Sequence, residues 1–340
     1  MSATVANGWL KDRPSDLTLI LGVTLLAGAM GGAVVLSPPL FVPLLFVHSW
    51  FFSFDHVAST FTKLAGLPED RRRNRFLIWG LPLLTFGATL LAGQTFGVET
   101  IATAYFFFQW FHTTRQSWGI AQHYRRAAGG LPTEPRWFSE LTMWSVPVWG
   151  LLNRCQQGHN RFLSMDLWLP PVPRVAVDLA GAASVALVAV YFFLKLRALR
   201  RGEGSLAHAL YVATHLVVFG LAYLVIEQLL AGWLLVNVWH NVQYLAYVWM
   251  HNRARFSDGV RADAPILSWL SQGGARRTAG YFGALIALSL PLFTAVYALT
   301  DRVDLWLDGR VISISLVLAL AVNFHHYLVD GVIWKSAARR

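Results

Sequence analysis

The sequence predicts an all-α, polytopic integral membrane protein, built as a bundle of about ten transmembrane helices. Its composition is the first observation behind this prediction: 55% of the 340 residues are hydrophobic and only 14% are charged. The second is a series of apolar runs, each close to the roughly 20 residues that a membrane helix needs. No change of composition marks a separate soluble domain, so we expect a single membrane domain over residues 1–340.

The boundaries of the expected helices follow from breaks between the apolar runs. Prolines open the second helix, a basic loop at 68–75 follows it, a Pro-rich segment at 170–173 precedes the sixth, and Gly232 separates the seventh from the eighth. The predicted transmembrane helices cover residues 16–36, 39–62, 76–92, 98–124, 137–153, 175–196, 206–230, 232–252, 281–299 and 311–334.

The distribution of charge is the third observation. Most of the 28 Lys and Arg residues fall in alternate loops and at both termini, including Lys335, Arg339 and Arg340. Because basic residues accumulate on cytoplasmic loops, this pattern predicts that both termini are cytoplasmic and that the helix number is even. The net charge of +10 therefore reflects membrane topology, and we expect no nucleic-acid partner. The single cysteine, Cys155, excludes an internal disulfide and a multi-cysteine metal site.

Histidines form a layer at one depth of the predicted bundle. His48, His112, His240 and His325 lie on four helices that run toward the cytoplasm, roughly 13–21 Å from their cytoplasmic ends at 1.5 Å per residue. Neutral imidazole is the commonest metal ligand, so the layer predicts a site for iron, copper or zinc. The candidate ligands are His48, His56, His112, His215, His240, His325 and His326, and whether they hold one metal or two stays open.

Polar residues near this layer have expected supporting roles. We expect Asp55 and Asp330 to orient imidazole rings, and Gln116 and Tyr244 to line open coordination positions. Asp55 is seven residues from His48, so the two are expected to share a helix face. The competing interpretation is that a histidine on a membrane helix makes a structural hydrogen bond, and we favour it for His123, His208 and His251, which lie near predicted helix ends.

Two segments of this layer resemble motifs of a known family. His325-x-x-x-x-Asp330, followed by Gly-Val-Ile-Trp-Lys, is similar to the last motif of the Brp/Blh family, in which a helix-borne His precedes an Asp by five residues. Phe111-His112-Thr113-Thr114 is similar in position to the second motif of that family. The family comprises bacterial membrane proteins that cleave beta-carotene to retinal with a histidine-bound iron.

Two further segments resemble this family less closely. Trp239-His240-Asn241-Val242-Gln243-Tyr244 is similar to its third motif, but Tyr244 stands where the family has a second histidine. The first family motif, His-Gly-x-x-Asp, is absent, and His48 with Asp55 is the nearest counterpart. The resemblance implies that His325, more than His326, faces the metal, because its spacing to Asp330 matches the family motif.

The resemblance and the histidine layer together imply a metal-dependent oxidoreductase. We expect a multi-pass protein of a bacterial-type inner (cytoplasmic) membrane that uses mono- or dinuclear Fe²⁺ and dioxygen to oxygenate a lipophilic substrate, such as a carotenoid, a retinoid or a lipid. Two alternatives stay open. One is a proton-coupled transporter with an intramembrane relay of His, Asp and Arg, and the other is a haem- or pigment-binding membrane subunit.

Overall fold

Almost the whole described chain is α-helical, as the sequence predicts. The computed structural model describes residues 8–158, 161–309 and 311–334, and helices account for 81% of the structure. The basic residues Lys335, Arg339 and Arg340 of the predicted cytoplasmic C-terminus lie outside the described residues.

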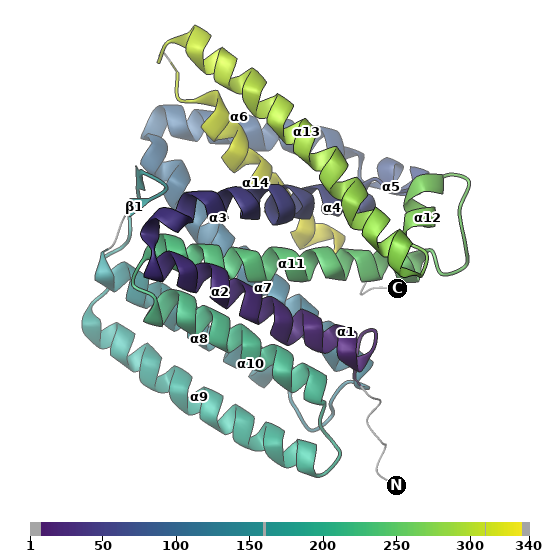
Figure 1. Cartoon of the computed structure of the whole chain (residues 1–340). Helices are drawn as coiled ribbons and strands as arrows, with labels where there is room; N and C mark the ends of the chain where they lie inside the picture. Colours follow the sequence, from purple (N-terminus) through teal and green to yellow (C-terminus); the bar gives the residue numbers. More distant parts are fainter. Residues whose placement is uncertain (1–7, 159–160, 310, 335–340) are drawn as a thin grey trace. The chain divides into compact units, whose positions relative to one another are not determined.

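Fourteen α-helices make up most of the described chain, and Figure 1 labels them. They are α1 (Arg13–Leu17), α2 (Val23–Leu36), α3 (Phe41–His48), α4 (Phe54–Leu64), α5 (Pro68–Arg73), α6 (Leu81–Phe96), α7 (Val98–Ala127), α8 (Arg136–Gln157), α9 (Arg174–Arg200), α10 (Leu206–Gly220), α11 (Leu229–Arg255), α12 (Pro265–Leu270), α13 (Ala275–Leu307) and α14 (Ile314–Ile333).

Shorter elements join some of these helices. Single π-helical turns continue α1, α3 and α10 and precede α6: η1 (Thr18–Gly22), η3 (Ser49–Ser53), η5 (Leu221–Val225) and η4 (Phe76–Gly80). A 3-10 turn, η2 (Pro38–Leu40), precedes α3, and two short strands, β1 (Arg161–Phe162) and β2 (Met165–Asp166), follow α8.

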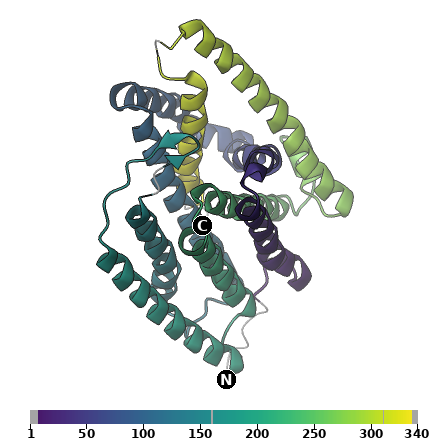
Figure 2. The ribbon, with the colours of Figure 1, turned by 60° about the vertical axis from the view of Figure 1, so that its left-hand side comes forward.

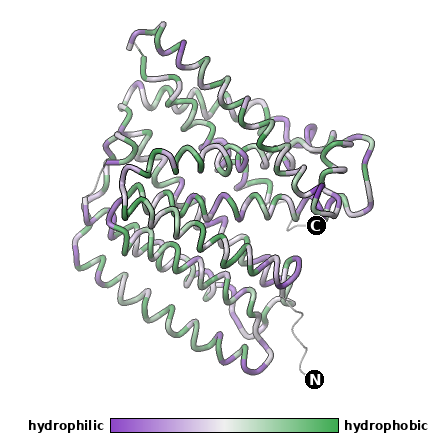
Figure 3. Tube along the Cα trace, viewed as in Figure 1, coloured by the Kyte–Doolittle hydropathy of each residue, from purple (hydrophilic) through white to green (hydrophobic). Residues whose placement is uncertain are grey.

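Seven helical stretches of the described residues are long and apolar enough to cross a membrane, which indicates an integral membrane protein. Apolar residues dominate these stretches, and hydrophilic residues gather in the connections (Figure 3). The stretches are Arg13–Leu36, Pro38–Leu64, Phe76–Phe96, Arg174–Arg200, Leu206–Val225, Ala275–Leu307 and Ile314–Ile333. That α7, α8 and α11 also cross the membrane, and that both termini are cytoplasmic, stay predictions.

The break between the seventh and eighth predicted helices lies earlier than expected. The seventh predicted helix ends with η5 at Val225, and the eighth begins as α11 at Leu229. Gly232 lies inside α11 rather than at the break. A Cβ on Gly232 would lie 2.2 Å from the carbonyl oxygen of Ala222, so glycine is needed there for α11 to pass the end of η5. The glycine marks a close approach of two backbones, which a sequence pattern alone does not distinguish from a helix end.

Contacts between residues divide the chain into two compact units. Unit 1 comprises Met1–Leu44, Trp110–Leu163 and Leu169–Gln243, and unit 2 comprises Leu45–Gln109, Ser164–Trp168 and Tyr244–Arg340. Helices α7 and α11 contribute residues to both units.

In unit 1, α8 packs against both α9 and α10, and the three helices lie side by side (Figures 1 and 2). The guanidinium of Arg154 in α8 is buried and donates hydrogen bonds to the carbonyl oxygens of Ala222 and Glu227, each at 2.7 Å, and to that of Ile226. These carbonyls lie at the end of η5, where the helix leaves them without partners of its own. Arg154 therefore stabilises the break that precedes α11.

In unit 2, α14 packs against α6, α4 and α13, and α13 also packs against α4. Leu64, Leu81, Val329 and Ile333 form one buried apolar cluster that joins α4, α6 and α14. These contacts hold the polar faces of α4 and α14 in the interior of the unit.

A buried ionic cluster in unit 1 surrounds Glu134, in the connection between α7 and α8. Its carboxylate pairs with the ammonium of Lys195, accepts a hydrogen bond from the Tyr191 hydroxyl at 3.0 Å, and lies 3.7 Å from the Arg125 guanidinium. His208 lies 3.8 Å away through Nδ1. Burial alone would raise the pKa of Glu134, but the charge of Lys195 and the hydrogen bonds from Lys195 and Tyr191 outweigh it and lower this pKa.

The ionic cluster predicts a pH-dependent stability. Because the pKa of Glu134 is lowered on folding, its contribution is complete above its usual value of 4.5 and is lost as the pH falls below that value. We expect Glu134→Gln to destabilise the protein by about 3–5 kcal/mol at neutral pH, since it breaks a buried pair, and the difference from the wild type to shrink below pH 4.5. Thermal unfolding in detergent at several pH values measures this. Glu140→Gln is the control, and an equal loss for both variants would contradict the assignment.

Candidate metal centre

The π-turn η3 determines which face of α4 carries histidine. A π-turn holds one residue more than an α-turn. His48 and His56, eight residues apart, are therefore oriented as two residues seven apart would be in a regular α-helix, and they lie on nearly the same face. Asp55 is thereby turned away from His48, contrary to the expected shared face. Its carboxylate accepts a hydrogen bond from Ser289 of α13.

Two buried histidines of unit 2 meet ring to ring. His56 of α4 and His326 of α14 are 4% and 2% exposed, and their Nε2 atoms lie 2.6 Å apart. Their rings meet nearly edge to face at a centroid distance of 4.4 Å. They belong to a histidine cluster whose nitrogen atoms could hold a metal ion.

A chain of hydrogen bonds fixes the tautomer of His326. The Tyr244 hydroxyl donates to the Asp330 carboxylate at 2.7 Å. The Thr60 hydroxyl therefore donates to Tyr244 at 2.9 Å, in preference to the more distant carbonyl oxygen of His56 at 3.4 Å. Thr60 Oγ1 is then the acceptor for Nδ1–H of His326, at 3.1 Å. His326 is consequently protonated on Nδ1, and its Nε2 carries a lone pair directed at His56. A metal ligand needs such an unprotonated nitrogen.

The Asp330 carboxylate lies at one end of this hydrogen-bond chain and also close to the His326 ring at the other end. Its second carboxylate oxygen, Oδ2, lies 3.6 Å from His326 Nε2. The sequence predicts that Asp330 orients a histidine, and in the structure Asp330 acts on His326 through Tyr244 and Thr60. A carboxylate placed this way favours cation binding at the histidine pair.

The neighbouring histidine of α14 has a different role. His325 donates its Nε2–H to the backbone carbonyl of Leu77 at 2.7 Å, and its ring lies over Phe61 at 6.1 Å. The expectation that His325 faces the centre more directly than His326 does not agree with these contacts. The reason is helix rotation: adjacent residues point about 100° apart on an α-helix, and the packing of α14 turns His326 toward α4.

In unit 1, the structure brings together two other candidate ligands. The rings of His112 in α7 and His240 in α11 meet edge to face with centroids 5.0 Å apart, and both side chains are buried. Gln116 lies one turn beyond His112, and both atoms of its side-chain amide are buried without a hydrogen-bond partner among the described residues. The expectation that all four helices meet at one centre concerns both units and stays a prediction.

The remaining candidates are His215 and His48. His215 hydrogen-bonds through Nε2 to the carbonyl oxygen of Met143 at 2.8 Å, and its ring packs against Phe219. This is the structural role that a histidine on a membrane helix commonly has. His48 is buried but lies about 10 Å along the helix axis from His56, farther than the one-turn spacing at which two histidines of a helix usually share an ion.

Three residues of this centre were not identified from the sequence. Thr60 and Lys63 follow His56 by four and seven residues and extend its helix face. The ammonium of Lys63 lies 3.4 Å from the ring centroid of Trp334, whose indole N–H lies 3.4 Å from the Tyr244 hydroxyl oxygen. The spacing His56-x-x-x-Thr60-x-x-Lys63 could have indicated this polar face.

Comparison of the chain with protein-family models, curated proteins and solved structures gives no match. The resemblance to the Brp/Blh motifs therefore stays an expectation, and the geometry of the buried histidines is what bears on function.

The hydrogen-bond chain predicts a specific cost for removing one hydroxyl. Tyr244→Phe removes the donor to Asp330 and the acceptor for Thr60, so buried polar groups lose their partners. We expect a destabilisation of about 1–3 kcal/mol, measured by unfolding in detergent. Tyr297→Phe is the matched control, because the Tyr297 ring packs against Phe54 and Phe293. Equal stability of the Tyr244→Phe variant and the wild type would contradict the chain.

Proposed function

We propose that the protein is a membrane-embedded oxidoreductase that uses a histidine-bound, non-haem metal, with iron as the expected metal. The observation that carries the proposal is the tautomer of His326: a buried imidazole whose Nδ1–H is bound by Thr60 and whose Nε2 lone pair faces the Nε2 of His56. Neutral imidazole suits iron, copper and zinc, and a nearby carboxylate favours a cation.

The residues of the chain have separate roles in this proposal. His56 and His326 bind the metal, while Thr60, Tyr244 and Asp330 hold the His326 ring and its tautomer. Catalytic metal centres generally have three protein ligands and keep one coordination position open, so His56 and His326 supply part of the ligand set. Bound ferrous iron would supply the redox chemistry with dioxygen, and the apolar helices would give access to a lipophilic substrate such as a carotenoid, a retinoid or a lipid.

Metal analysis of the purified protein tests this proposal. Protein produced with iron and purified in detergent should hold at least about half an equivalent of transition metal. His326→Ala should lower the metal content at least tenfold, and Asp330→Asn should weaken the affinity by about 10–100-fold, as is typical for groups that orient a ligand. His325→Ala is the control and should keep the metal, because His325 bonds to a backbone carbonyl. Wild-type protein without bound metal would end the proposal.

A proton-coupled transporter is the second candidate function, and one observation favours it. The chain from Asp330 through Tyr244 and Thr60 to His326 is a continuous hydrogen-bonded path between two ionisable groups, as a proton relay in a membrane requires. Proton-driven uptake into proteoliposomes by metal-free protein would favour this function over the first.

A haem held between His56 and His326 is not compatible with their separation. A porphyrin bound by two axial histidines lies between their nitrogens, and 2.6 Å leaves no room for it. We therefore expect the absorption spectrum of the purified protein to show no Soret band from a haem bound by this pair.

A further inference from the structure

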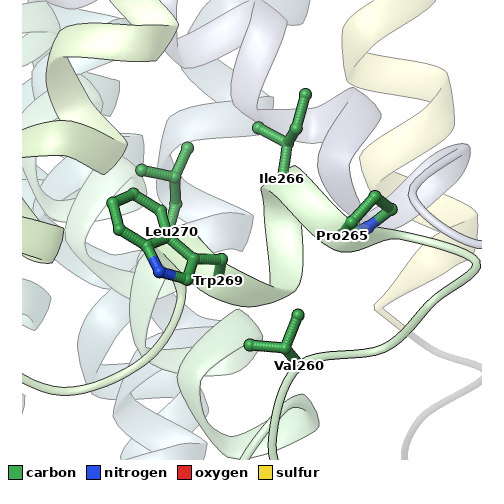
Figure 4. Close-up of a pocket in the computed structure, with 5 residues that line it drawn as sticks. All are labelled: Val260, Pro265, Ile266, Trp269 and Leu270. Carbon is green, nitrogen blue, oxygen red and sulfur yellow. The ribbon is translucent and has the colours of Figure 1, made fainter.

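An apolar pocket opens at the surface of unit 2 where a membrane-spanning helix begins. Val260, Pro265, Ile266, Trp269 and Leu270 line it, and its volume is about 460 Å³ (Figure 4). Ile266 is 74% exposed, Val260 55% and Trp269 49%. Every residue of this lining is apolar, so contact with an apolar group is more favourable for the pocket than contact with water.

The pocket belongs to α12, a short helix that is apolar on two sides. Leu267 and Leu270 are partly buried and pack against a buried cluster that includes Trp249 and Tyr281 of α11 and α13, while Leu270 also reaches the pocket. Ile266 and Trp269 are exposed on the outer side. A helix that buries one apolar face in the protein and exposes a second is suited to the boundary of a bilayer, where tryptophan is also enriched.

The charges around α12 are predominantly positive after ion pairing. Arg255 pairs with Asp70 at 2.7 Å, and Arg261 pairs with Asp263 at 2.6 Å. Arg276 and Arg277, at the start of α13, have no acidic partner within ion-pair distance in the described part of the chain. The Arg277 guanidinium lies over the Trp269 ring at 5.5 Å, directly beside the pocket.

We propose that this pocket binds an anionic phospholipid, whose acyl chain enters the space between Ile266 and Trp269 and whose phosphate pairs with Arg276 and Arg277. The apolar lining fits a hydrocarbon chain and excludes a charged headgroup. The two arginines provide the complementary charge where the span Ala275–Leu307 begins. A guanidinium is well suited to a phosphate because it donates several hydrogen bonds in one plane. The site is independent of the proposed metal centre.

Native mass spectrometry of the detergent-purified full chain tests the lipid site. Phosphatidylglycerol and phosphatidylcholine with the same acyl chains are added separately, and the bound fractions are compared. We expect phosphatidylglycerol to be retained preferentially. The double variant Arg276→Gln/Arg277→Gln should lose roughly 25-fold in affinity for it, at roughly fivefold for each basic residue near an anionic lipid.

Matched variants separate this site from general attraction to positive charge. Arg200→Gln/Arg201→Gln removes two exposed arginines at the end of α9 and should leave phosphatidylglycerol binding unchanged. Ile266→Asn should weaken binding of both phospholipids, because it makes the pocket polar. Glycerol phosphate, which has the charge but no acyl chain, should not compete.

Three results would overturn the proposal. They are equal retention of the two phospholipids by the wild type, equal phosphatidylglycerol binding by the Arg276→Gln/Arg277→Gln variant and the wild type, and full competition by glycerol phosphate. A bound polypeptide whose mass is lost in Ile266→Asn would also contradict it, since the pocket would then be a protein-binding surface.

Discussion

The hydrogen bond between Nδ1 of His326 and the Thr60 hydroxyl is the interaction on which the candidate centre depends. It is the step at which a chain beginning at Asp330 reaches the imidazole ring and determines which nitrogen carries the proton. Without it, both tautomers of His326 would be available, and the Nε2 lone pair would face His56 only part of the time. The chemistry of α14 therefore depends on a hydroxyl supplied by α4.

Buried polar groups elsewhere in the chain also depend on partners that the protein supplies. Polar groups inside an apolar bundle have no water to bind and are costly unless the protein supplies partners. In unit 1, Arg154 and the carbonyls at the end of η5 satisfy one another, and the Glu134 cluster binds three basic side chains and a tyrosine. These partners come from segments that are far apart in sequence, so each polar cluster also fixes how helices pack within its unit.

The sequence predicted the helical class and the positions of the long helices, because apolar runs of membrane length have few other solutions. It did not predict the orientation of α14: His325 and His326 are adjacent, and only packing against α4 and α6 decides which one points inward. Thr60 was missed for a related reason. A threonine within an apolar helix commonly bonds to its own backbone, and its role here appears only when Tyr244 and His326 are brought to it. Gly232 was assigned to a helix end, although a close backbone approach explains it.

The π-turn η3 has a consequence for recognising relatives of this chain. One inserted residue between His48 and Phe54 brings His48 and His56 to one helix face at a spacing of eight. A relative with a regular α-helix in this place would present the same two histidines on one face at a spacing of seven. Sequence comparison that requires a fixed spacing would treat these two helices as different motifs, although their surfaces would be equivalent. An alignment of such proteins would place a single-residue gap inside a continuous transmembrane helix.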